Sequence, residues 1–249
     1  MENEQEWIGG RNPVLEALRS ERDIQKIYIA EASQKGVMKQ VIALAKERKL
    51  QIQFVPKQKI DKVVEGAHQG VAAQISAYQY AELDELFERA STRNEQPFFI
   101  LLDELEDPHN LGSIMRTADA VGAHGIIIPN RRSVGLTQTV AKASTGAIEH
   151  IPVVRVTNLN KTIDVLKDRG LWIFGTDAKG SSDYRTMDVD MSLGIVIGSE
   201  GAGMSRLVRE KCDFLVHLPM KGKVTSLNAS VAASILLYEV YRKRYPLEG

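Results

Sequence analysis

Cysteine is almost absent from this 249-residue chain: Cys212 is the only one, so no disulfide can form within it. A single thiol is typical of proteins in a reducing compartment, and we expect the protein to be cytoplasmic. Cys212 follows Arg209, Glu210 and Lys211 in a helix-like segment, with no obvious base partner in the sequence. We interpret it as a structural residue, and no nucleophilic triad can be recognised.

Long apolar runs are also absent. The longest uninterrupted ones are far shorter than the ~20 residues that a membrane span needs. The first six residues are acidic and lack the basic-then-apolar layout of a secretory signal. A hydrophobic content of 43% with 26% charged residues is ordinary for a soluble globular protein. The length accommodates one large or two modest domains.

The chain has no excess of charge of either sign, because 32 basic residues balance 32 acidic ones. The distribution is uneven, however. Between Lys35 and Lys62 the sequence has eight basic and two acidic residues, and between Glu82 and Asp107 it has nine acidic and two basic. A basic face can attract the phosphates of RNA, but the same residues can form a solvated helix face. Composition leaves both interpretations open.

Metal-ligand spacing is absent as well. The five histidines are scattered, without a second histidine or a cysteine at the short spacings of metal sites: His68, His109, His124, His150 and His217. We therefore predict no metal requirement. His109 adjoins Asn110 and is a candidate for substrate contact, whereas the other four fit structural roles.

Three polar clusters are the most informative feature that the sequence does contain. The apolar run Phe98–Leu102 leads to Asn110 and then to a helical segment that carries Arg116. A second run, 193–197, breaks into a glycine-rich turn around Glu200, and the third cluster is Ser226-Leu227-Asn228, before a long helix expected over Ala229–Arg244. Ligands of parallel α/β sheets bind beyond the carboxyl ends of the strands, so one shared site is expected.

Strand-like and helix-like segments alternate from Pro97 onward, which predicts a parallel sheet with both faces covered. We expect strands at Phe98–Leu102, Gly125–Ile128, Pro152–Val156, Leu171–Gly175, Gly194–Ile197 and Leu215–Leu218. The intervening helices are expected near Leu111–Ala120, Thr137–Thr145, Leu159–Asp168 and Ser205–Lys211.

The domain organisation predicted from these patterns has three parts. Residues 1–78 form a compact α/β unit, with helices through Leu18, near 37–45 and over Ile60–Val64, and strands at Ile24–Ala30, Ile52–Val55 and Val71–Ala77. Residues 79–95 form a linker with a helix over Tyr80–Ala90, broken by the polar stretch that follows. Residues 96–249 form the main domain.

Asn110 with Arg116, Glu200 in its glycine-rich turn, and Ser226-Leu227-Asn228 together resemble the motifs of the SpoU/TrmH class of SPOUT RNA 2′-O-methyltransferases. The resemblance covers nearly the whole chain. It implies an α/β fold whose C-terminal parallel sheet has helices on both faces and a trefoil knot, after a small L30e-like RNA-binding domain. It also implies a homodimer that transfers a methyl group from S-adenosylmethionine to the ribose 2′-hydroxyl of a guanosine in large-subunit ribosomal RNA.

The resemblance implies a catalytic set of Asn110, Arg116, Glu200, Ser226 and Asn228. Arg116 either takes the proton of the 2′-hydroxyl or, since arginine normally stays protonated, binds phosphate and stabilises the developing alkoxide. Glu200 is expected to pair with Arg116 or Asn110. The structural alternatives are helix caps for the polar residues before helices, dipole compensation for Glu200, and a surface arginine.

The implied cofactor cradle consists mostly of backbone and apolar side chains: Thr176, Ile197, Gly198, Leu218, Met220, Leu227 and Asn228. RNA contacts are expected from Arg131, Arg132 and Lys142, although loop arginines are often merely solvated. The terminal helix offers an apolar stripe that either joins two subunits or faces the core: Ile235, Leu236, Leu237, Val240 and Tyr241.

Three other functions compete with this interpretation. A transfer-RNA ribose methyltransferase would share the catalytic domain, and an RNA-binding assembly factor would share the fold without turnover, although a pure binder does not need the full polar set. A nucleotide-dependent oxidoreductase is disfavoured because Gly198, Gly201 and Gly203 do not form the G-x-G-x-x-G dinucleotide fingerprint.

Overall fold

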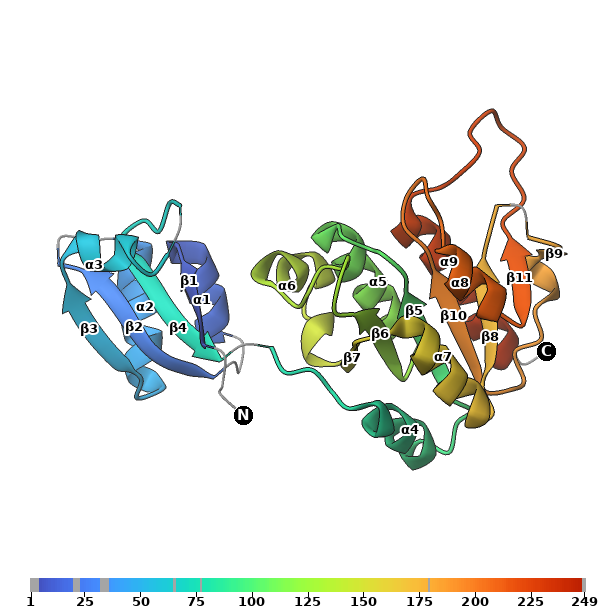
Figure 1. The fold of residues 1–249 in the computed structure, drawn as a ribbon. Coiled ribbons are helices and arrows are strands. Elements are labelled where there is room, and N and C mark those ends of the chain that lie inside the picture. Colours follow the sequence, from blue (N-terminus) through green and yellow to red (C-terminus); the bar gives the residue numbers. More distant parts are fainter. Residues whose placement is uncertain are drawn as a thin grey trace. The chain divides into compact units, whose positions relative to one another are not determined.

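A computed structural model describes residues 5–19, 23–31, 36–64, 66–76, 78–178 and 180–247. The chain divides into two compact units, Met1–Gln79 and Tyr80–Gly249, and each is considered by itself (Figure 1). Lys35, at the start of the basic run, and Ala77, at the end of a predicted strand, lie outside the described residues.

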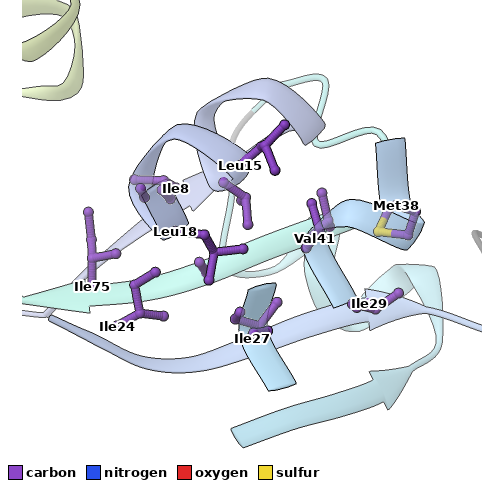
Figure 2. Close-up of a cluster of buried hydrophobic side chains, with 14 residues drawn as sticks. Ile8, Leu15, Leu18, Ile24, Ile27, Ile29, Met38, Val41 and Ile75 are labelled. Atoms are coloured by element: carbon purple, nitrogen blue, oxygen red, sulfur yellow. The ribbon is translucent and has the colours of Figure 1, made fainter. Parts of the chain in front are cut away.

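The N-terminal unit is a four-stranded mixed sheet in the order β1-β4-β2-β3, with β1 and β2 antiparallel to β4, and β3 parallel to β2. Its strands are β1 (Gln5–Gly9), β2 (Ile24–Ala30), β3 (Gln51–Val55) and β4 (Val71–Ser76), and its helices are α1 (Arg11–Arg19), α2 (Val37–Glu47) and α3 (Lys57–Asp61). Figure 2 shows how side chains of α1, α2, β2 and β4 form one apolar core, which includes Leu18, Ile27 and Val41.

One prediction for this unit is wrong, and one strand was missed. The short helix begins at Lys57 instead of Ile60, because Pro56 ends the preceding strand and suits a helix start. Strand β1 was not predicted, since the segment has only Trp7 and Ile8 as apolar residues; it adds to the sheet by pairing with β4 along its whole length.

The C-terminal unit contains a seven-stranded sheet in the order β7-β6-β5-β10-β8-β11-β9, and each pair of neighbouring strands is parallel. This confirms the predicted parallel α/β architecture. The strands are β5 (Phe98–Leu102), β6 (Gly125–Pro129), β7 (Val153–Val156), β8 (Trp172–Thr176), β9 (Ser182–Asp183), β10 (Leu193–Ile197) and β11 (Phe214–His217). Only the two-residue strand β9 was not predicted.

Helices cover both faces of this sheet. Helices α4 (Leu83–Thr92), α7 (Leu159–Asp168) and α8 (Arg206–Lys211) share a core with alternate side chains of the central strands, such as Phe99 and Leu101. The other helical layer contains α5 (Pro108–Ala120), which packs against α6 (Gln138–Ser144) and α9 (Ala229–Arg244). Two short 3₁₀ helices lie at Ala147–Glu149 and Tyr184–Thr186.

Helix α4 begins at Leu83 rather than at the predicted Tyr80. Glu85 accepts a hydrogen bond from the backbone N–H of Glu82 at 2.7 Å, forming a capping box at that point, and Ala81 instead makes a β-bridge with Val154. Leu86 is fully buried in the core of the C-terminal unit, so most of the segment 79–95 is packed against that unit. In the described residues no helix is long and apolar enough to cross a membrane. The trefoil knot stays a prediction.

Candidate active site

The carboxyl ends of four adjacent strands, β5, β10, β8 and β11, form one edge of the sheet of the C-terminal unit. Asp103 follows β5, Gly198 follows β10, and Leu218 follows β11. All three predicted polar clusters begin beyond this edge, as expected for the ligand-binding side of a parallel sheet.

The turn after β10 is a closed loop whose backbone fixes Glu200. Ser199 and Gly203 exchange two backbone hydrogen bonds, both of 3.0 Å, and Gly201 and Gly203 have positive φ angles of 82° and 70°. Gly198 allows this loop to fold back, since a Cβ atom there would lie 2.2 Å from the carbonyl carbon of Gly203. The backbone geometry of this turn therefore accounts for all three glycines.

Glu200, Asn110 and Asn228 form one hydrogen-bonded cluster. The side-chain amide of Asn110 donates to Glu200 Oε1 at 2.8 Å, and the amide of Asn228 donates both to Asn110 Oδ1 at 2.9 Å and to Glu200. Asn110 is only 4% exposed. The three motifs, far apart in the sequence, thus meet at one point, with Glu200 bonded to Asn110 rather than to Arg116.

Asn228 does two things at once. It is the N-cap of α9, with Oδ1 accepting from the backbone N–H groups of Ser230 and Val231 at 3.0 and 3.3 Å. Its amide group points to the cluster, and Glu200 also accepts from the backbone N–H of Ala229 at 3.4 Å. The capping role is therefore confirmed, and it does not prevent Asn228 from bonding to Asn110 and Glu200.

Asn110 is not a helix cap, so that alternative is wrong. Helix α5 begins three residues earlier than predicted, with Asp107 as N-cap accepting from the backbone N–H of His109 at 2.8 Å and Pro108 in the first turn. Asn110 consequently lies inside the helix. Thr117, two turns further on, is hydrogen-bonded to Ser234 of α9 at 2.9 Å, which fixes the two helices that carry the cluster.

Asp103 supports the cluster and was not singled out from the sequence. It is 4% exposed, and its carboxylate accepts from the backbone N–H of Ser205 at 2.6 Å, while its own backbone N–H donates to Ile197. It thereby fixes the end of β5 to the end of β10 and the start of α8. The signal available in the sequence was an acidic residue directly after a buried apolar strand.

Arg116 and Ser226 lie outside this bonded cluster. Both are exposed, Arg116 on α5 and Ser226 on the loop before α9, and neither makes a hydrogen bond or ion pair among the described residues. Arginine keeps its charge and offers a planar set of donors, so Arg116 presents an unsatisfied guanidinium to any bound anion.

The predicted cofactor residues fall into two groups. Thr176, Ile197, Gly198 and Leu218 lie at the adjacent carboxyl ends of β8, β10 and β11. Met220 and Leu227 belong to the loop 219–227, seen as the extended red segment between β11 and α9 in Figure 1. Met220 is 38% exposed and Leu227 is half-buried, so the loop does not close over the strand ends.

A cleft of about 340 Å³ adjoins the cluster on the side of β5. Four carboxylate residues contribute to its lining, together with Leu105, Asn110 and Ser199: Glu104, Glu106, Asp107 and Glu200. Such a lining repels phosphates and accepts hydrogen bonds. It therefore suits a group rich in N–H donors better than an RNA backbone.

The predicted RNA-contacting residues are exposed. Arg131 and Arg132 follow β6 and Lys142 lies on α6. Arg132 is ion-paired with Glu104 at 2.8 Å, and this carboxylate raises the pKa of the Arg132 guanidinium. A surface pair of this kind is weak, so Arg132 can exchange its partner for a phosphate.

Burial raises the pKa of the Cys212 thiol to about 12, so this thiol is protonated at neutral pH. Its Sγ donates to the carbonyl of Val208 at 3.3 Å. The described residues contain no group of three or more histidine, cysteine or acidic side chains arranged to hold a metal ion.

Comparison with known families assigns both units. The model of the SpoU rRNA methylase family matches residues 97–238, and the model described as RNA 2′-O ribose methyltransferase substrate binding matches residues 7–81. A protein of Bacillus subtilis assigned to the TrmH family of tRNA/rRNA methyltransferases is 64% identical over 247 residues, which cover 99% of each chain.

Solved structures agree with the sequence comparison. The SpoU methyltransferase AviRb of Streptomyces viridochromogenes, in complex with AdoMet, is 28% identical and superposes with a TM-score of 0.77 over 96% of this chain and 90% of its own. An AdoMet-bound rRNA methyltransferase of Sinorhizobium meliloti is 27% identical, with a TM-score of 0.69 over 98% and 88%.

A TrmH/SpoU tRNA-modifying enzyme of A. aeolicus is 27% identical and covers only 64% of this chain and 84% of its own, with a TM-score of 0.55. The cluster of three motif residues at the sheet edge, the matching family models and these relatives lead to one assignment. This chain belongs to the SpoU/TrmH family and is an S-adenosylmethionine-dependent RNA methyltransferase.

Proposed function

We propose that the protein methylates the ribose 2′-hydroxyl of a guanosine in large-subunit ribosomal RNA, in the cytoplasm. The presence of the N-terminal unit is the observation that supports ribosomal RNA as the substrate. The rRNA enzyme of S. meliloti is matched over 98% of this chain, which includes that unit, whereas the tRNA-modifying enzyme is matched over 64%. Residues 1–78 would bind RNA, 79–95 connect the domains, and 96–249 carry the reaction.

The choice of guanosine is supported by the acidic cleft. The Watson–Crick edge of guanine presents two neighbouring N–H donors, and the cleft beside Asn110 is lined by carboxylates that can accept them. Uracil and cytosine each offer donors at only one position of that edge. A guanine seated there would bring its ribose next to the bonded cluster.

Bound S-adenosylmethionine supplies an activated methyl group on sulfur, and the chain supplies position and charge. Thr176, Ile197, Gly198 and Leu218 would hold it at the strand ends, with Met220 and Leu227 contributed by the loop above. Asn110, Glu200 and Asn228 would fix the reacting end of this cradle, and such positioning contributes several kcal/mol to a rate enhancement.

Arg116 and Ser226 would act on the acceptor. Arg116 has a guanidinium without a partner among the described residues, so it can bind the phosphate of the target nucleotide and stabilise the negative charge that develops on the 2′-oxygen. In this step the 2′-oxygen would bond to the methyl carbon, its proton would pass to water, and the carbon–sulfur bond would break to leave a neutral thioether. Ser226, exposed on the same loop as Leu227, would contact the ribose. Arg131, Arg132 and Lys142 would hold the flanking RNA backbone.

A homodimer through α9 is part of the proposal. Three of the predicted interface residues, Leu236, Leu237 and Val240, are buried within the chain itself, so for them the core interpretation is correct. The same helix nevertheless exposes a row of large apolar side chains: Val231, Ile235, Tyr238, Tyr241 and Tyr245. A contiguous patch of this kind commonly marks an interface. Sedimentation of wild type and of Tyr238→Asp tests it, with a monomeric wild type as the contradicting result.

The decisive experiment is methyl transfer from labelled S-adenosylmethionine to ribosomal RNA from cells that lack the protein, with the labelled nucleotide mapped by resistance to cleavage. Arg116→Lys is the informative variant, because lysine keeps the charge but loses the planar donors. We expect label on a guanosine ribose with wild type and a strong loss with Arg116→Lys. If only transfer RNA is labelled, transfer RNA replaces ribosomal RNA as the substrate. If no RNA is labelled, the result favours a non-catalytic assembly factor.

A further inference from the structure

The N-terminal unit contains a second cavity, of about 720 Å³, that the proposed reaction does not use. It is lined by Arg11 at the start of α1, Lys57 and Asp61 of α3, Ala30 at the end of β2, and the loop Gly66–Gly70. This volume lies in the range of about 300–1,000 Å³ typical of pockets that enclose a small molecule. The lining holds two cations and one carboxylate among its side chains, together with polar groups of the loop.

The loop that forms one wall is held by a buried histidine. His68 is 3% exposed; its Nδ1 accepts from the backbone N–H of Gly70 at 3.1 Å, so the proton lies on Nε2, which donates to Asp61 at 2.8 Å. The backbone N–H of Ala30 donates to Gly70 at 2.9 Å. These bonds occupy the one carboxylate of the cavity and fix the loop to the end of β2.

Gln69 lies at the top of this loop in a conformation that a glutamine rarely adopts, with φ +51°. Its side-chain oxygen accepts from the backbone N–H of Arg11 at 3.3 Å, and its carbonyl accepts from Arg11 Nε at 3.3 Å. The bond from Nε fixes the orientation of the Arg11 guanidinium. Its two terminal nitrogens have no bonded partner among the described residues. Backbone strain of this kind is often found at ligand-binding positions.

We infer that this cavity binds one unpaired nucleotide of the RNA substrate, with Arg11 and Lys57 on its phosphate and Gln69 on the edge of its base; the inference rests on the proposed RNA-modifying function. Arginine and lysine provide the donors for phosphate, and the one carboxylate of the lining, Asp61, accepts from His68 through Oδ1. The amide of Gln69 provides both a donor and an acceptor, as base edges require. A base-paired nucleotide cannot enter a cavity, so a loop or bulge is the expected RNA element.

The test is filter binding of the full-length protein to large-subunit ribosomal RNA transcribed in vitro, at several salt concentrations. Arg11→Gln/Lys57→Gln should raise the Kd roughly tenfold at physiological salt and lower the slope of log K against log salt by about 0.7, since both cations contact one phosphate and each phosphate contact contributes about 0.7 on single-stranded RNA. Gln69→Gly, which suits the positive φ, should weaken binding without changing the slope.

The matched control is Arg19→Gln/Lys46→Gln, which removes the same charge from the same unit. Both residues are exposed at the ends of α1 and α2 opposite to the cavity, where Arg48 donates to the carbonyls of Ala17 and Leu18. An equal loss with both double variants would show diffuse attraction and overturn the inference, as would unchanged binding with Arg11→Gln/Lys57→Gln. Thermal melting confirms that each variant is folded.

Two further measurements separate the alternatives. The cavity variant should keep the wild-type kcat at saturating RNA and the wild-type affinity for S-adenosylmethionine, with only the KM for RNA increased. A wild type that binds RNA through the cavity but transfers no methyl group would contradict the proposed function and leave this inference standing. Binding of guanosine monophosphate or inorganic phosphate as tight as that of RNA would identify a small-molecule site and overturn it.

Discussion

The bonded cluster and the exposed part of the same site are built differently. Asn110, Glu200 and Asn228 use most of their polar groups on one another and on the start of α9. Arg116, Ser226 and Met220 are exposed, and the first two have no bonded partner among the described residues. Glu200 and Asn228 are themselves exposed, so the two regions differ in their bonding and not in their burial. Groups bonded within the fold contribute to its stability, whereas unbonded groups remain available to ligands, so the two regions should respond to substitution in opposite ways.

The largest expected effect lies in the exposed region. Arg116→Ala should lower kcat by roughly 10²–10³-fold, in the range found for removal of a group that stabilises developing charge. Its Tm should stay within about 1 °C of wild type, because an exposed side chain without partners contributes little to stability. Methyl-transfer kinetics and calorimetry on the same preparation measure both quantities. Asp119→Ala, also exposed on α5, is the control, and comparable losses of activity in both would remove Arg116 from the site.

Two glycine substitutions compare the regions directly. Gly198→Ala places a Cβ atom 2.2 Å from the backbone of Gly203, so the turn that carries Glu200 must shift. We expect a loss of about 3 kcal/mol in the free energy of unfolding, the upper part of the usual range for overpacking, together with weaker S-adenosylmethionine binding.

Gly222→Ala is the matched substitution in the exposed loop, where the nearest atom to an added Cβ is Val224 Cγ2 at 4.0 Å. Alanine should be neutral or stabilising there by about 0.4–1 kcal/mol, since it restricts the unfolded chain. Urea denaturation of the two variants side by side decides the point. Similar losses in both would mean that the loop is as tightly packed as the turn.

Asn110→Ala should destabilise the protein by about 0.5–1.5 kcal/mol, the net contribution of a typical hydrogen bond, because the groups of Glu200 and Asn228 that lose a partner are exposed and can bond to water. Asn110 is 4% exposed, and its removal takes a partner from both Glu200 and Asn228. Ser226→Ala, which removes a hydroxyl of the exposed region, should leave the unfolding midpoint unchanged. A stable Asn110→Ala variant would show that the cluster contributes to activity alone.

The convergence of the three motifs could be predicted from the sequence, because each follows a predicted strand and parallel strands end at one edge. The bonding within the site could not. Asn110 and Asn228 are 118 residues apart, and no local pattern shows that one asparagine caps a helix while bonding to the other. The cap of α5 was recognisable in Asp107-Pro108, but the apolar residue Leu111 was taken as the helix start. Periodicity also fails for the segment 219–227, where the chain forms neither a helix nor a strand.

The smallest expected effect concerns Cys212, on the packed side of β8. A Cβ atom at Gly175 would lie 2.6 Å from Cys212 Sγ, so the thiol occupies space that the glycine leaves open. Its pKa, ordinarily 9.0, is raised to about 12 by burial, so the folded state keeps the proton that the unfolded state loses.

This difference fixes the direction of a pH effect. The stability that Cys212 contributes is fully present below pH 9 and is lost as the pH rises from about 9 towards 12, because the unfolded state then binds fewer protons. Cys212→Ser should remove this part of the decline when unfolding is measured by urea at pH 8, 9 and 10. The folded thiol should also react with iodoacetamide at pH 8 roughly a thousandfold more slowly than the urea-unfolded one, in line with its smaller thiolate fraction. Rapid labelling of the folded protein would show that the Cys212 thiol is accessible to solvent, like the loop 219–227.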